Sequence, residues 1–163
     1  HILFHEAFHA YMQYFVPHQP MWLAEGTAEV MEATQIKGKE IKLDSGAIHE
    51  VNLKVLKHFL GRKQTYELRD LVKLDMPQYK ANRNVAYTQG WGFVHFLLYA
   101  ENGKYKRHYN DVIVHLRNGL STKEAVAKAF AGVDWDKIQA AWEDYIRSLK
   151  PDGQKDSIDL KGD

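Results

Sequence analysis

The chain has 163 residues, enough for one domain with a sizeable core, and its 45% hydrophobic and 26% charged residues are ordinary for a globular protein. The formal net charge is +1 with no long basic run, so nucleic acid is not indicated as a partner, and no apolar run reaches the length of a membrane span. Cysteine is absent, which excludes disulfides and thiolate zinc ligands and leaves the compartment open.

The first predicted element is a helix from the start of the chain to about Phe15, and it carries the pattern HEAFH. His5 and His9 are four residues apart, which places both imidazoles on one face of the helix, one turn apart. Two such rings can enter one tetrahedral metal shell, and Glu6 can reach a metal-bound water without binding the metal. This is the HExxH arrangement of zinc peptidases. His1 also falls on this face, but we do not count it as a ligand.

A second helix follows Pro17 and Pro20 and reads MWLAEGTAEVMEAT, with Glu25, Glu29 and Glu32 at i, i+4 and i+7. Three carboxylates on one face are usually only a solvated surface. Here they follow a tight turn after HExxH, so the two helices can lie antiparallel with the acidic face over the histidines. Glu25 would then complete a His/His/Glu shell around one Zn²⁺ and leave the fourth position for water. Glu29 would accept the other ring N–H of a ligand histidine.

The motif HEAFH, a turn, and then WLAEGTAEV resembles the gluzincin, or peptidase MA-like, zinc metallopeptidases. The fifteen-residue gap between His9 and Glu25 looks most like bacterial members of that group whose function is unknown. Metzincins fit poorly, because Met12 and Phe15 occupy their required Gly and His positions. Aspzincins fit in part, and on their pattern Glu29 rather than Glu25 would bind the metal.

The resemblance implies a mainly α fold, the helical C-terminal half of a zincin or thermolysin-like catalytic domain, over residues 1–150. It also implies a β-rich segment of the same protein before HExxH, missing from this sequence, whose edge strand would hold a peptide or protein substrate. Residues 35–43 predict at most a small hairpin, and residues 151–163 a flexible polar tail. The implied activity is zinc-dependent hydrolysis of a peptide bond by a metal-activated water, with Glu6 as general base.

Farther along the chain, residues 49–60 form a helical stripe with Gly61 at its C′ position, and Thr65 caps a short helix. The segment MPQYKANRN predicts a loop. From near Asn84 to before Gly103 the sequence is nearly apolar all round, which predicts a buried central helix packed closely at its glycines. Three more helices follow, one of which opens with the capping box of Ser121 and Glu124.

Tyr87 lies near the start of the central helix, in a Y-x-x-G-W segment similar to one in gluzincins of the aminopeptidase-N type. The resemblance implies that Tyr87 hydrogen-bonds the oxyanion of the transition state. A core tyrosine is the alternative interpretation. His95, two turns on, is the second candidate for this role, although a lone histidine on an apolar helix is more often a core residue.

Two other functions stay open on the sequence alone. The first is a non-catalytic zinc-binding or scaffold domain descended from a gluzincin. The intact HExxH motif together with Glu25 and Glu29 argues against it, because decayed members commonly lose the general base or a ligand. The second keeps the zinc site but hydrolyses a non-peptide amide or an epoxide.

Overall fold

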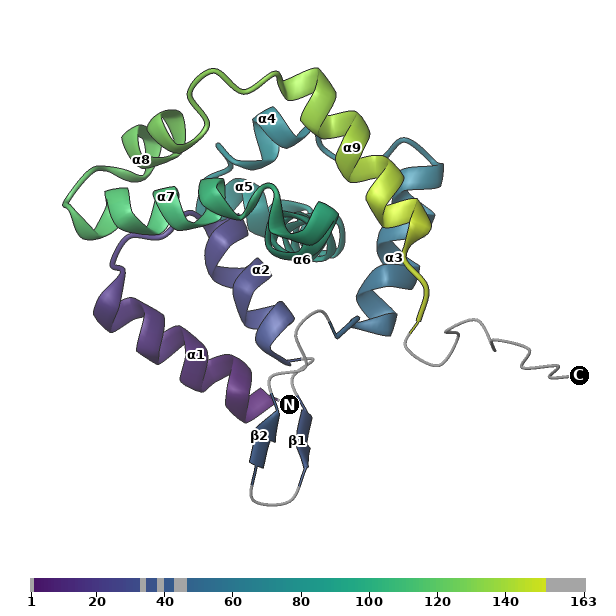
Figure 1. The fold of residues 1–163 in the computed structure, drawn as a ribbon, viewed down its shortest axis with the longest axis horizontal. Coiled ribbons are helices and arrows are strands. Elements are labelled where there is room, and N and C mark those ends of the chain that lie inside the picture. Colours follow the sequence, from purple (N-terminus) through teal and green to yellow (C-terminus); the bar gives the residue numbers. More distant parts are fainter. Residues whose placement is uncertain (1, 33–34, 38–39, 43–46, 152–163) are drawn as a thin grey trace, which may run out of the picture.

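A computed structural model describes residues 2–32, 35–37, 40–42 and 47–151, and the fold is mainly helical, as predicted (Figure 1). His1 and the predicted tail beyond Pro151 lie outside the described residues. No helix within the described ranges has the length and apolarity needed to cross a bilayer. The elements in chain order are α1 (Ile2–Phe15), α2 (Met21–Glu32), β1 (Gln35–Lys37), β2 (Glu40–Lys42), α3 (Glu50–Gly61), α4 (Leu68–Leu71), α5 (Met76–Ala81), α6 (Arg83–Tyr99), a 3₁₀ turn (Ala100–Gly103), α7 (Lys106–Arg117), α8 (Thr122–Ala129) and α9 (Trp135–Ser148).

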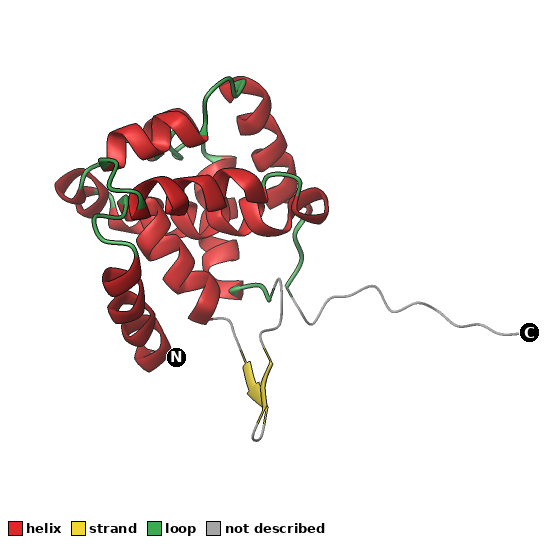
Figure 2. Cartoon of the chain, turned by 60° about the vertical axis from the view of Figure 1, so that its left-hand side comes forward, coloured by secondary structure: helices red, strands yellow, loops and turns green. Residues whose placement is uncertain are grey.

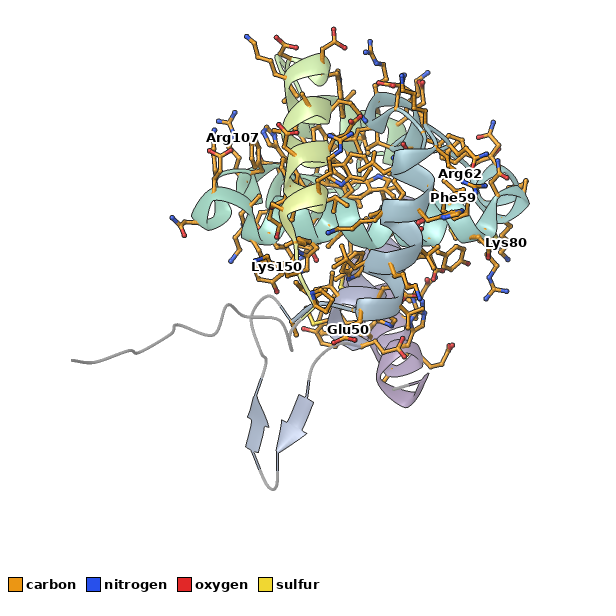
Figure 3. All side chains as sticks on the ribbon, turned by 90° about the vertical axis from the view of Figure 1, so that its right-hand side faces the viewer. Glu50, Phe59, Arg62, Lys80, Arg107 and Lys150 are labelled. Atoms are coloured by element: carbon orange, nitrogen blue, oxygen red, sulfur yellow. The ribbon has the colours of Figure 1, made fainter. Side chains whose placement is uncertain are left out.

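Helix α6 lies at the centre of the fold, and Figure 1 views it along its axis. Every side chain from Thr88 to Leu97 is buried, because α2, α3, α7 and α9 pack around this helix. In Figure 3, α3 and α9 lie side by side across the length of α6. The predicted buried central helix is therefore confirmed, and its apolar surface on all sides is the physical reason for its position.

Helices α2 and α6 cross in backbone contact. A Cβ atom on Gly26 would collide with the carbonyl of Gly90, and a Cβ atom on Gly90 would collide with the hydroxyl of Tyr79. On the other side of α6, a Cβ atom on Gly92 would collide with Leu56 of α3. The close packing predicted at the glycines of α6 is confirmed, and it holds α2 firmly against the core.

Helix α1 runs antiparallel to α2 and makes its main packing contact with it (Figure 1). The turn between them passes through His18, which has a left-handed backbone with φ 60°, and the His18 carbonyl accepts a hydrogen bond from the hydroxyl of Thr122 at 2.5 Å. On the outer face of α1, Tyr11, Tyr14 and Phe15 are exposed and their rings contact one another. The helix that carries both histidines is thus anchored at its C-terminal end and along one face.

The loop predicted over MPQYKANRN is wrong, because helix α5 forms there. The Asp75 side chain accepts a hydrogen bond from the Gln78 backbone N–H at 2.8 Å, and the Gln78 side chain accepts one from the Asp75 N–H at 3.0 Å. This capping box, with Pro77 in the first turn, is a helix start signal. Helix α5 matters because it places Tyr79 beside α2.

Of three further predictions about where elements begin, end or form, two are wrong and one is confirmed. The predicted C′ role of Gly61 is wrong, because α3 continues through Gly61 and the left-handed residue is Lys63, with φ 54°. The predicted cap by Thr65 is wrong, because α4 begins at Leu68. The hairpin is confirmed as an antiparallel pair of three-residue strands with Ile36 opposite Ile41, and Figure 2 shows these strands as the only ones drawn beside the red helices.

Candidate metal centre

Helix α1 brings two imidazoles together at one point. His5 and His9 lie one turn apart, their rings meet edge to face with centroids 4.7 Å apart, and their Nε2 atoms are 3.0 Å apart. Both side chains are only partly exposed, 17% for His5 and 29% for His9. The geometry expected from their spacing is therefore present, with the same nitrogen of each ring turned to a common centre.

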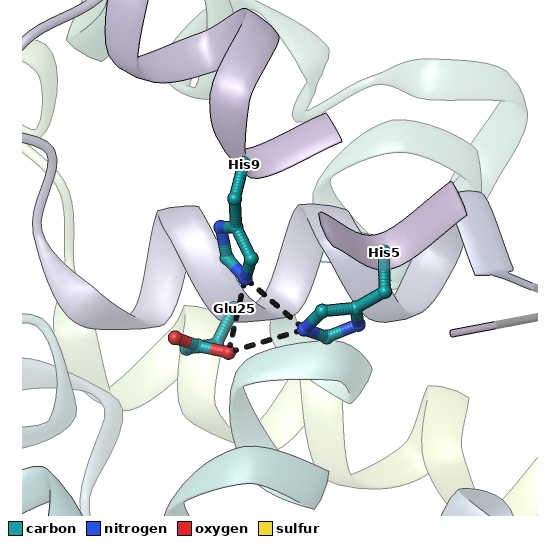
Figure 4. A group of neighbouring side chains, drawn as sticks. All are labelled: His5, His9 and Glu25. Carbon is teal, nitrogen blue, oxygen red and sulfur yellow. Dashed lines mark hydrogen bonds and ion pairs between the residues drawn. The ribbon is translucent and has the colours of Figure 1, made fainter. Parts of the chain in front are cut away.

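Helix α2 adds a carboxylate to this pair, as Figure 4 shows. One oxygen of Glu25, Oε2, lies 3.6 Å from His5 Nε2 and 3.5 Å from His9 Nε2. The Glu25 side chain is 14% exposed. Of the two carboxylates considered from the sequence, Glu25 rather than Glu29 is the one that faces both ring nitrogens.

These three atoms have the separations of a tetrahedral zinc shell. The circle through them has a radius of about 2.0 Å, which is the length of a Zn–N or Zn–O bond, so one ion could contact all three. Two imidazole nitrogens and a carboxylate oxygen are also a donor set that zinc accepts, and three protein ligands is the number found in catalytic zinc sites. The residues present therefore fit a catalytic type of zinc site.

Glu6 follows the first ligand directly on α1. Its side chain is exposed and makes no hydrogen bond or ion pair with any described residue. A carboxylate that is free of protein partners and adjacent to a metal ligand can accept a proton from water. Glu6 thus has the freedom that a general base needs, and it does not take part in the His/His/Glu cluster.

The carboxylate nearest to the other nitrogen of His5 belongs to Glu32, whose Oε2 lies 3.5 Å from His5 Nδ1. This Nδ1 atom is buried and has no hydrogen-bond partner among the described residues. Glu29 also comes within 4.8 Å of His5, but its carboxylate accepts a hydrogen bond from Asn52 at 2.9 Å and lies 3.8 Å from His49 Nε2. Glu29 therefore contacts Asn52 of α3 and His49 before it, Glu32 is the carboxylate nearer to His5 Nδ1, and a role of Glu29 toward a ligand histidine stays a prediction.

Two tyrosines, Tyr79 of α5 and Tyr87 of α6, are close enough to Glu25 for its charge to affect their hydroxyl groups. Tyr87 of α6 is half-buried, its ring lies 5.1 Å from that of Tyr79, and the Arg83 guanidinium lies 5.4 Å from its ring centre. Partial burial and the Glu25 carboxylate raise the pKa of Tyr87, and Arg83 opposes the shift. Burial, followed by the same carboxylate, raises the pKa of Tyr79 well above its usual value. Both phenols therefore stay protonated at neutral pH, and Tyr87 is the one that solvent can reach.

The sequence did not indicate that Tyr79 lies near the site, because its segment was predicted to be a loop. Its side chain is fully buried, and its hydroxyl has no hydrogen-bond partner among the described residues. The signal that could have found it was the capping box at the start of α5.

His95, the second candidate for the oxyanion role, is a core residue. It is 2% exposed, its Nδ1 forms a hydrogen bond of 2.8 Å with the Tyr145 hydroxyl, and its ring contacts Trp91 and Tyr99. These contacts hold the imidazole between α6 and α9. His108 is similarly occupied, because its Nδ1 lies 2.7 Å from the Ala129 carbonyl and its ring stacks on Phe130.

Comparison with known proteins gives one family. A family model described as "Protein of unknown function (DUF1570)" matches residues 2–115, a range that contains both histidines, Glu25 and Tyr87. Neither the curated proteins nor the solved structures include a match to this chain.

Proposed function

Because this chain belongs to the DUF1570 family, whose description states no activity, we propose from its own residues that it is a zinc-dependent peptidase. The observation that carries the proposal is the convergence of His5 Nε2, His9 Nε2 and Glu25 Oε2 at separations of 3.0, 3.6 and 3.5 Å. His5, His9 and Glu25 together supply the three protein ligands of such a zinc site.

Each ligand comes from an element that the fold holds in place. The two histidines lie on one face of α1. Glu25 lies on α2, which packs in backbone contact with α6 at Gly26. A zinc ion bound there would supply Lewis-acid chemistry, lowering the pKa of its water toward ~7 and polarising a substrate carbonyl.

Glu6 and Tyr87 then have separate tasks. The Glu6 carboxylate accepts a proton from the attacking water and passes it to the leaving amine. The Tyr87 hydroxyl, which is protonated at neutral pH as phenols ordinarily are, donates a hydrogen bond to the oxygen that gains charge as the carbonyl carbon becomes tetrahedral.

Glu32 supports the first ligand in this scheme. A histidine that offers Nε2 to a metal carries its proton on Nδ1, and that proton needs an acceptor to fix the ring. The Glu32 carboxylate lies 3.5 Å from the buried Nδ1 of His5, so it is the acceptor within reach.

The substrate class proposed is a peptide or protein chain. By the gluzincin resemblance, we expect the substrate to bind in extended form along the edge of a β-strand.

Metal content tests the proposal most directly. Mass spectrometry of the purified protein should find about one zinc per chain, and His9→Ala and Glu25→Ala should lose or weaken it. His58→Ala and Glu50→Ala, which change exposed residues of the same types on α3, should keep it. Absence of zinc after reconstitution would refute the proposal.

Turnover separates an enzyme from a zinc-binding scaffold. Glu6→Gln should keep the metal and abolish peptide hydrolysis by the full-length protein, because only the proton acceptor is removed. Hydrolysis that persists in this variant would exclude Glu6 as the base. Zinc that is held by the wild-type protein without any cleavage would favour the non-catalytic zinc-binding domain.

A further inference from the structure

A second feature lies next to the proposed metal centre. It is a cavity of about 720 Å³ whose walls come from residues 19–21 at the start of α2, residues 72–76 before and into α5, and the inner face of α8. Most of the lining side chains are apolar, among them Met21, Met76, Val126 and Phe130. None of the three proposed ligands lines it. The volume falls in the range of sites that bind drug-sized ligands, which is more than one amino-acid side chain fills.

Two helices connect the cavity to the metal centre. On α2, Met21 of the cavity and Glu25 of the metal centre are four residues apart and therefore share one face. On α5, Met76 of the cavity lies one turn before Tyr79, whose ring lies 5.1 Å from that of Tyr87. The cavity thus begins about one helical turn, roughly 5.4 Å along the axis, from the proposed zinc ligand.

We propose that this cavity binds two adjacent large apolar residues of the polypeptide substrate, on one side of the bond that is cut. The inference rests on the proposed peptidase function. An extended chain advances about 3.3 Å per residue, so about two residues of the substrate span the roughly 5.4 Å along α2. Met21, Met76 and Phe130 of the lining contact the side chains of this segment.

The probes are fluorescein-labelled octapeptides of Gly and Ser with Leu-Phe, Ala-Ala or Lys-Lys at the centre. Binding is followed by fluorescence anisotropy on zinc-loaded full-length Glu6→Gln protein, in which cleavage is disabled. The Leu-Phe peptide should bind at least about tenfold more tightly than the Ala-Ala peptide, because two large side chains leave water. Equal binding of the three peptides would overturn the inference.

Substitutions in the cavity test whether the tighter binding of the Leu-Phe peptide arises there. Ala127→Trp fills the cavity from α8 and should erase the advantage of Leu-Phe. Ala131→Trp makes the same change at an exposed position that does not line the cavity, and should retain it. Met76→Lys, at a rim residue that is 53% exposed and so tolerant of charge, gives a second test and should also erase the advantage. An advantage that survives both cavity variants would overturn the inference.

Measuring zinc in the same samples distinguishes a failure of the cavity proposal from a failure of the peptidase proposal. A protein that holds zinc but shows no Leu-Phe advantage contradicts the cavity assignment and leaves the metal centre standing. A protein that binds no zinc but prefers Leu-Phe, and loses this preference in Ala127→Trp, contradicts the peptidase proposal while supporting an apolar peptide site.

Discussion

The role of Glu32 can be tested by comparing two carboxylates on the same helix. Glu32→Gln keeps the size of the side chain and one acceptor oxygen but removes the negative charge 3.5 Å from His5 Nδ1. Loss of the group that supports a metal-binding histidine typically lowers metal affinity about 10–100-fold, which is about 1.4–2.7 kcal/mol. The zinc dissociation constant should therefore rise about tenfold, at the lower end of the range for residues that support a metal ligand.

Glu29→Gln is the matched control. Its carboxylate accepts a hydrogen bond from Asn52 and lies near His49, so the change should lower the stability of the α2–α3 contact and leave zinc affinity within about threefold. Competition with a chromophoric zinc chelator gives both dissociation constants, and thermal unfolding of the zinc-free proteins gives the stabilities. A larger loss of affinity in Glu29→Gln than in Glu32→Gln would refute the assignment and restore the interpretation made from sequence.

Three further predictions concern catalysis and packing. Tyr87→Phe should keep zinc and lower kcat about 10²–10³-fold, as loss of one oxyanion donor does, and an unchanged kcat would exclude Tyr87 from that role. Gly90→Ala should lower stability by about 1–3 kcal/mol in denaturant unfolding, because its methyl group meets the hydroxyl of Tyr79, whereas Gly61→Ala, with open space around it, should be neutral or slightly stabilising. Ser121→Ala should cost about 0.5–2 kcal/mol by the same measurement, because it removes the capping box of α8, and an unchanged midpoint would contradict that role.

The parts of the site that follow helical spacing could be predicted from the sequence. The separation of His5 and His9 by four residues places their rings together on any α-helix, and the short turn after α1 brings Glu25 over them. Which carboxylate supports His5 depends instead on the angle at which α1 crosses α2. Glu29 and Glu32 share a face of α2, and local sequence does not determine which of them meets Nδ1.

The mainly helical fold was likewise predictable, and the errors fall where start and stop signals are ambiguous. Asp75 and Pro77 suit a turn as well as a first helical turn, and only Gln78 three residues after Asp75 marks the capping box of α5. Gly61 resembles a helix end, yet α3 reaches its left-handed residue only at Lys63. The cavity could not be predicted, because it joins segments about fifty residues apart in the chain.

The way α1 is attached has a consequence for the protein without metal. This helix carries two of the three proposed ligands, packs mainly on α2, and is anchored by the turn at His18. In a chain without cysteine, a zinc ion that joins His9 to Glu25 would act as a cross-link, closing a short loop and restraining the N-terminal half of α1. Chelation should therefore speed hydrogen exchange in α1 while the amides of α6 keep their protection, so that the metal centre controls the order of the helix that builds it.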